Sequence, residues 1–128
     1  MASTYAYERV SPIGDTEPMN MPVADIDAAI AWYESKMGFT VKSRTDDPVA
    51  AVVMTRDDIE LGFAVNGGDP EQASCYIAVS DGHAAMADLE SKGVSVGNHR
   101  IDEHGDSKYE VFFVRDDDGI CYCIGQPA

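Results

Sequence analysis

Glu60 is the residue of this sequence with the clearest potential for chemistry. It lies in the segment DIELGFAV (58–65), in which Ile59, Leu61 and Phe63 alternate with Glu60 and with small or polar residues. This alternation is typical of a strand with one buried face. A carboxylate on the opposite face can pair with a cationic ligand, or act as a general base if burial raises its pKa. An exposed or salt-bridged strand glutamate is the alternative.

Cys121 and Cys123 form a second candidate pair, in the strand-like segment GICYCIG (119–125). Alternate residues of a strand share a face and lie about 7 Å apart, which disfavours a mutual disulfide. With Cys75 they make an odd number of cysteines in a chain without a secretory signal, so we expect reduced thiols. Burial as small hydrophobic residues is the alternative to a ligand-binding or nucleophilic role, because no local base or cation would lower a thiol pKa.

Ser74 and Tyr76 share one face of the segment SCYIAV (74–79). We expect both to line the same site as the two cysteines, with Tyr76 as an aromatic wall. Ordinary strand packing is the alternative for Tyr76.

His99, Glu103 and His104 lie close together in the segment NHRIDEHGDSK (98–108). Their spacing fits no helical zinc motif. We interpret this segment as a strand end followed by a polar loop at the rim of the site, within reach of a ligand.

The elements that position these residues come from an internal repeat. The segments AAIAWYESKMG (28–38) and AAMADLESKG (84–93) are nearly identical, and Asp25 and Asp81 precede them at the same spacing. Matching patterns extend to both sides. The chain therefore holds two copies of one supersecondary unit, at 18–66 and 74–126.

Each copy has the pattern of a strand, a helix and three further strands. Asp25 suits the N-cap of a helix whose apolar residues recur at helical spacing, and Gly38 suits its end. We expect Trp32 and Tyr33 of this helix to pack in the core. The Asp-rich stretches at 46–47, 57–58 and 116–118 are typical of surface turns. The remaining predicted elements are strands at 19–24, 39–44, 49–55, 59–65, 75–80, 94–101, 109–115 and 119–125, and a second helix at 82–92.

This order predicts an α+β fold of two tandem βαβββ modules. One helix can cover one face of a four-stranded sheet, so the other faces of the two sheets are expected to form a curved, cup-shaped wall with the helices outside. Small ligands bind in such cups. Residues 18–128 then form a single domain, and 1–17 are an N-terminal extension for which an added edge strand or an arm are both open.

Composition and charge exclude several classes of partner. The chain has 128 residues, 45% hydrophobic and 25% charged, which is ordinary for one globular domain. No apolar run is long enough to span a membrane, and the N-terminus has no secretory signal, so we expect a cytoplasmic protein. The net charge of −14 opposes binding to nucleic acids and anionic membranes and favours a cationic partner.

The chain also resembles a known superfamily, the vicinal-oxygen-chelate proteins, which include glyoxalase I, bleomycin-resistance proteins and extradiol dioxygenases. PVADIDAAIAWYESKMGF (22–39) resembles the start of the family's module, and VFFVRDDDG (111–119) resembles its ending, with Asp117 in place of the usual proline. The resemblance covers about residues 18–126 and implies the cup-shaped fold.

The metal-dependent members of that superfamily hold a divalent ion with four side chains. The matching positions here are Pro18, Glu60, Ser74 and Cys123. Pro18 and Ser74 are not credible ligands. The remaining carboxylate and thiol make a poor site for Mg²⁺, Mn²⁺ or Ni²⁺, which bind several oxygen or imidazole donors. The resemblance therefore implies a protein without a divalent metal or other cofactor.

The favoured hypothesis is a metal-independent protein of the bleomycin-resistance type. It would sequester a small organic ligand, with cationic antibiotic-like molecules as the class that Glu60 suits, and Glu60, Ser74, Tyr76, Cys121 and Cys123 would line the cup. The resemblance also implies a homodimer, with cups formed within one chain or across two. The alternative hypothesis is a glyoxalase-like lyase or isomerase that acts on a small carbonyl compound with Glu60 as the base.

Overall fold

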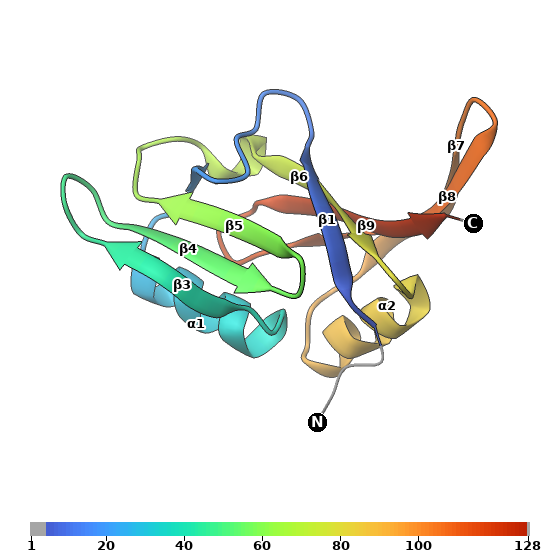
Figure 1. Ribbon diagram of the computed structural model, residues 1–128, viewed down its shortest axis with the longest axis horizontal. Coiled ribbons are helices and arrows are strands. Elements are labelled where there is room, and N and C mark those ends of the chain that lie inside the picture. The colour runs from blue at the N-terminus through green and yellow to red at the C-terminus, as the bar shows by residue number, and fades with distance from the viewer. Residues whose placement is uncertain (1–4, 128) are drawn as a thin grey trace.

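The computed structural model describes residues 5–127, apart from the side chain of His104. The chain folds into two βαβββ modules preceded by one additional strand, β1 (Tyr7–Pro12) (Figure 1). This is the predicted α+β class. Neither helix of the described part is long and apolar enough to cross a membrane.

The first module forms a sheet that we call the N-terminal sheet. Its strand order is β2-β5-β4-β3, and β5 pairs parallel with β2 and antiparallel with β4. The helix α1 covers one face of this sheet (Figure 1). The elements are β2 (Met21–Pro22), α1 (Ile26–Lys36), β3 (Thr40–Thr45), β4 (Ala51–Arg56) and β5 (Ile59–Ala64).

The second module forms the C-terminal sheet, with strand order β1-β6-β9-β8-β7. Its last four strands repeat the order of the N-terminal sheet, and β9 is parallel to β6 as β5 is to β2. The sequence repeat is therefore a repeat of topology. The N-terminal extension supplies β1, an edge strand antiparallel to β6. The other elements are the 3₁₀ turn η1 (Pro70–Gln72), β6 (Ser74–Val79), α2 (Gly82–Ser91), β7 (Gly97–His104), β8 (Ser107–Arg115) and β9 (Cys121–Pro127).

The two helices begin and end as the repeat predicts. The carboxylates of Asp25 and Asp81 accept hydrogen bonds from the backbone N–H groups of Ala28 and Ala84, at 3.2 and 3.1 Å. Such N-caps stabilise a helix by about 1 kcal/mol. The glycines that follow the helices, at 38 and 93, have φ angles of 70° and 84°, a left-handed conformation that favours glycine.

The two sheets remain separate instead of merging into one curved wall. Their inner faces, which the helices cover, contribute to one hydrophobic core. Tyr33 of α1 lies between the sheets, with its ring centroid 4.5 Å from that of Phe63 and 6.2 Å from that of Tyr122. The opposite faces, which we call the outer faces, therefore lie on the outside of the chain, on either side of this common core.

A buried hydrogen-bond network crosses the boundary between the modules. The hydroxyl of Tyr33 donates to Asp116, and the hydroxyl of Tyr122 lies 2.7 Å from that of Tyr33. The other carboxylate oxygen of Asp116 accepts from the backbone N–H groups of residues 118–120, at 2.8 to 2.9 Å. Burial raises the pKa of Asp116.

Asp116 therefore contradicts the prediction of a surface turn at 116–118. Its exposed fraction is 8%. The turn itself exists, with Gly119 at a φ of 103°, but the helix of the other module covers its first residue. The amino-acid composition of a turn does not indicate whether another element will pack over it.

The polar loop predicted at 102–108, after the strand end at 101, is also wrong. These residues continue the ladder as a β-hairpin, with Asp102 opposite Tyr109 and Glu103 opposite Lys108. The tight turn contains Gly105, at a φ of 63°. The opposite charges of Glu103 and Lys108 support this exposed pairing across the strands. The polarity of the same residues is equally typical of a loop.

We predict that Tyr33→Phe lowers the free energy of unfolding by about 1–3 kcal/mol, because it leaves the buried Asp116 without its hydroxyl donor. Chemical denaturation at constant pH measures the effect. Tyr76→Phe is the matched control: it removes a hydroxyl from the outer face and should change stability by less than about 0.5 kcal/mol. Equal effects of the two variants would contradict a stabilising network.

Candidate ligand site

The outer face of the C-terminal sheet brings together four of the five predicted site residues. Ser74 and Tyr76 of β6 lie opposite Cys121 and Cys123 of β9 in the parallel ladder. Residues on this face of β6 are half-buried and alternate with fully buried ones such as Cys75. Since opposite residues in a ladder point to the same face, the four side chains form one continuous patch.

A hollow of about 190 Å³ lies on this face. Five strands contribute to it, and its lining residues are Arg9 of β1, Tyr76 of β6, Asp102 of β7, Tyr109 and Val111 of β8, and Cys123 of β9. Gly125 of β9 leaves space at the bottom of the hollow because it has no side chain. A Cβ at this position would lie 2.6 Å from Val111 and 3.4 Å from the hydroxyl of Tyr76. Any larger residue at this position would displace the neighbouring side chains of the hollow.

The thiol and phenol of the hollow are neutral at physiological pH. Burial raises the pKa of Cys123 to about 11, with the nearby Asp102 carboxylate adding to the effect. Burial likewise raises the pKa of Tyr76, against the opposing charge of Arg9. The hollow thus offers hydrogen-bonding groups and an aromatic surface, and neither group is activated as a nucleophile.

Asp102, the carboxylate of the hollow, is already engaged. The guanidinium of Arg100 donates to both of its oxygens, at 2.7 and 3.4 Å. The same guanidinium lies 5.0 Å from the ring centroid of Phe113. The positive charge of Arg100 and the negative charge of Asp102 therefore nearly cancel at this edge of the hollow.

Glu60 lies apart from the other predicted residues, on the outer face of the N-terminal sheet. It forms an ion pair with Lys42 of β3, and its side chain is 39% exposed. It lines neither the C-terminal hollow nor a second hollow of about 220 Å³ on its own sheet, which includes Met19, Val53 and Phe63. A paired, solvated carboxylate offers no specific support for the role of general base.

Cys121 lines a different cavity, a groove of about 690 Å³ between the modules. Trp32 and Lys36 of α1 form one side of it and Phe113 of β8 lies on the other. Trp32 packs against the core, as predicted, but its half-buried ring also faces this groove.

The predicted rim residues lie away from the hollow. The Nε2 atom of His99 is 3.0 Å from a carboxylate oxygen of Glu110, whose other oxygen is 2.9 Å from His83 of α2. His99 therefore points to the helix side of the hairpin. Glu103 lies 3.6 Å from Lys108, and the side chain of His104 is outside the described residues.

The family's metal-binding positions do not fit a divalent ion in this chain. Pro18 has no side-chain donor, and its carbonyl accepts from the N–H of Gly62 at 2.8 Å. Glu60 and Cys123 lie on the outer faces of different sheets and do not converge on one site. Within residues 5–127 as described, no group of three or more His, Cys, Asp and Glu side chains is arranged to hold a metal.

The structure adds Arg9, Asp102, Tyr109 and Val111 to the site. The alternation in YEVFFVR places Tyr109 and Val111 on one face, so this signal was available in the sequence. No local pattern indicated that β1 would lie beside β6 and bring Arg9 to the same face.

Comparisons with known proteins agree with this architecture. The family model described as the Glyoxalase/Bleomycin resistance protein/Dioxygenase superfamily matches residues 16–124. The chain belongs to this superfamily. A search of curated proteins finds no significant match.

Several solved structures share this fold. A bleomycin-binding protein complexed with bleomycin is 25% identical, with a TM-score of 0.65 over 88% of this chain and 98% of that one. An antibiotic-binding protein from Streptomyces sp. CB03234 is 17% identical, with a TM-score of 0.69 over 91% and 98%. An integron cassette protein from V. cholerae is 18% identical, with a TM-score of 0.68 over 89% and 95%.

We predict that Cys123 reacts slowly with iodoacetamide at pH 7.5. A pKa of about 11 in place of an ordinary value of 9.0 lowers the thiolate fraction by about 100-fold. Mass spectrometry of a Cys121→Ser variant, in which Cys75 is fully buried, measures the rate against that of free N-acetylcysteine. The rate should keep rising up to about pH 11, and a plateau below pH 9 would show an activated thiol instead.

Proposed function

We propose that this protein binds a small organic molecule on the outer face of the C-terminal sheet and holds it without a metal ion and without turnover. The observation that carries the proposal is the hollow itself, in which two tyrosines, an aliphatic side chain and a neutral thiol surround a polar edge. Mostly apolar concave sites with a few polar groups are the usual form of small-molecule sites. A bleomycin-binding protein and an antibiotic-binding protein among the structural relatives favour an antibiotic-like ligand.

The metal-independent character rests on the donor set. Two of the four family positions hold a proline and a serine, and the remaining carboxylate pairs with Lys42. Of the four positions this leaves the thiol of Cys123, and one thiol falls short of the three or four protein ligands usual for zinc.

Glu60 does not determine the charge of the ligand that the hollow binds. The sequence favours a cationic ligand through the carboxylate of Glu60 and through the net charge of −14. Lys42 compensates the charge of Glu60, and Glu60 lies outside the hollow. The overall charge of −14 still attracts cations over long distances, but it does not select the ligand that enters.

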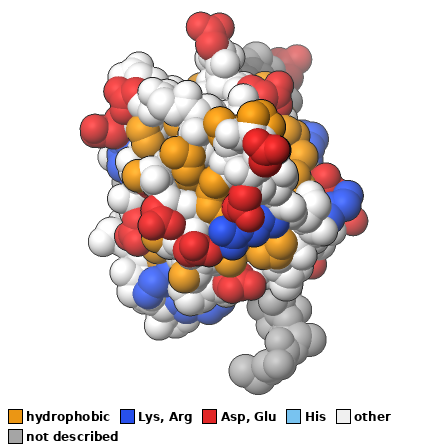
Figure 2. Space-filling model, turned by 90° about the vertical axis from the view of Figure 1, so that its left-hand side faces the viewer, with side chains coloured by type: hydrophobic (Ala, Val, Ile, Leu, Met, Phe, Trp, Pro, Cys, Tyr) orange, Lys and Arg blue, Asp and Glu red, His pale blue; other side chains and the backbone are white. Residues whose placement is uncertain are grey.

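We further propose that the protein is a homodimer in which each outer face is covered by a second copy. Neither helix covers the outer face of its sheet, and on one chain these faces lie on either side of the common core. Figure 2 shows the side of the molecule that carries the N-terminal sheet, where hydrophobic side chains gather with charged ones around and among them. Met19, beside the hollow of this sheet, is 44% exposed. A second copy would deepen the shallow hollow into a cup.

The cytoplasm is the compartment that we propose. All three cysteines are free, with Cys75 and Cys123 buried. A reducing environment maintains such thiols.

We predict that an antibiotic panel that includes bleomycin contains a compound that raises the melting temperature. A ligand at 100 times its Kd stabilises the folded state by about 2.7 kcal/mol. Tyr76→Ala should abolish the shift, because it removes an aromatic wall, whereas Tyr5→Phe, outside the hollow, should retain it. The proposal fails if no compound stabilises the protein or if added Zn²⁺ or Ni²⁺ is required.

We predict that the wild-type protein sediments with twice the mass of one chain at micromolar concentration. Val53→Arg, on the outer face of β4, should yield monomers because it places an unpaired charge within the contact. The control Val49→Arg changes a residue that is 44% exposed outside the strands and should remain dimeric. A monomeric wild-type protein in analytical ultracentrifugation would exclude the proposed assembly.

A further inference from the structure

We propose that the C-terminal hollow selects aromatic organic anions, such as aryl carboxylates or sulfonates, and that Arg9 binds the anionic group. This inference rests on the proposed ligand-binding function and specifies its ligand class. Arg9 comes from β1, outside the two repeated modules. The selectivity would therefore be a property of the N-terminal extension.

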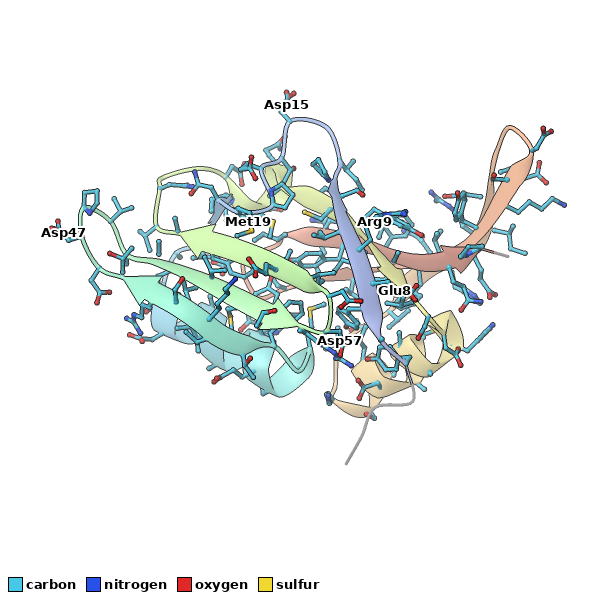
Figure 3. The ribbon with its side chains drawn as sticks, viewed as in Figure 1. Glu8, Arg9, Asp15, Met19, Asp47 and Asp57 are labelled. Atoms are coloured by element: carbon cyan, nitrogen blue, oxygen red, sulfur yellow. The ribbon has the colours of Figure 1, made fainter. Side chains whose placement is uncertain are left out.

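Arg9 is positioned at the hollow by the pairing of β1 with β6. It lies opposite Ala78, which shares a face with Tyr76. Figure 3 shows Arg9 extending from β1 across the neighbouring strands β6 and β9. Arg9 and Tyr76 both line the hollow, and the charge of Arg9 opposes the burial that raises the pKa of the Tyr76 phenol.

Arg9 differs from the other four arginines in its contacts. Within the described residues, its side chain forms no hydrogen bond and no ion pair. The others donate to protein acceptors: Arg44 to Asp27, Arg56 to the carbonyl of Met37, Arg100 to Asp102, and Arg115 to the carbonyl of Gly119. In a chain with 23 acidic residues, a guanidinium that points into a hollow and leaves its donors available is suited to an external acceptor.

The other groups of the hollow do not oppose an anion. Asp102 is held by Arg100 in a two-oxygen contact. Tyr76 and Cys123 keep their protons and can donate to an acceptor. Glu110, the next carboxylate along β8, belongs to the helix side, where it contacts His83 and His99. With the Arg100–Asp102 pair nearly neutral, Arg9 determines the sign of the local charge.

The aromatic part of the ligand follows from the remaining walls. Tyr76, Tyr109 and Val111 provide flat and apolar surface beside the guanidinium. Apolar contact with these walls supplies binding energy, and the bidentate donors of Arg9 fix the orientation of a carboxylate or sulfonate. The protein's net negative charge acts over distances that salt screens, with a Debye length of about 8 Å at 0.15 M. At this ionic strength the direct contact decides selectivity.

The test compares two fluorescent probes that share an aromatic skeleton. One is 8-anilinonaphthalene-1-sulfonate and the other is N-phenyl-1-naphthylamine, which lacks the sulfonate. Both are titrated at 0.15 M salt into folded wild-type protein, Arg9→Gln, Arg9→Lys and the control Arg115→Gln. Near-UV circular dichroism verifies that every variant keeps its tertiary packing, because the sulfonate probe also binds partly folded proteins.

The expected result is saturable binding of the sulfonate probe with one site per chain. Its Kd should rise about tenfold in Arg9→Gln and less in Arg9→Lys, and remain unchanged in Arg115→Gln. The Kd of the uncharged probe should be weaker and insensitive to Arg9. Equal affinity for the two probes, or the same loss for both in Arg9→Gln, would overturn the anion selectivity.

The outcomes separate this inference from the proposed function. If both probes bind equally and Tyr76→Ala weakens both, the hollow binds organic molecules without charge selection, and only the role of Arg9 fails. If neither probe binds but an antibiotic stabilises the protein, the aromatic-anion class is wrong and ligand binding stands. If no probe and no antibiotic binds, the proposed function fails as well.

Discussion

The hydroxyl of Tyr33, held between Asp116 and Tyr122, determines how the two modules pack. Tyr33 belongs to the helix of the first module, while both of its partners belong to the second. The contact is buried, so any packing of the modules that kept these groups from water but broke the contact would leave the Tyr33 hydroxyl without a partner, at a cost of about 1–3 kcal/mol. A purely apolar seam would permit several packings of similar energy, whereas this network is satisfied in one arrangement.

This arrangement decides where a ligand can bind. Because α1 packs between the sheets, both inner faces are filled with side chains, and the hollows lie on the outer faces. The C-terminal outer face gains β1 and Arg9 at its edge, and the N-terminal outer face gains the Lys42–Glu60 pair. Two copies of one scaffold thus present different chemistry, although their strand orders are the same.

Several features were predictable because they are local or repeated. The N-cap carboxylates, the helix-ending glycines and the alternation along β5, β6 and β9 act over a few residues, so the printed sequence contains them in full. The pairing of Ser74 and Tyr76 with the cysteines followed from alternation together with the repeat. The burial of Asp116 and the strand pairing at 102–108 were mispredicted, since polar composition describes a buried turn, an exposed strand and a loop equally well.

The sequence by itself determined the class of fold, the two modules and the residues that share each strand face. These features depend on the spacing of apolar residues, which differs between helices and strands and can be read along the chain. The tertiary structure decided which faces meet. It placed Glu60 on one sheet and the tyrosine–thiol hollow on the other, paired Glu60 with Lys42, and brought Arg9 from the extension to the hollow. These outcomes depend on contacts between residues far apart in the chain, whose energies no local pattern encodes.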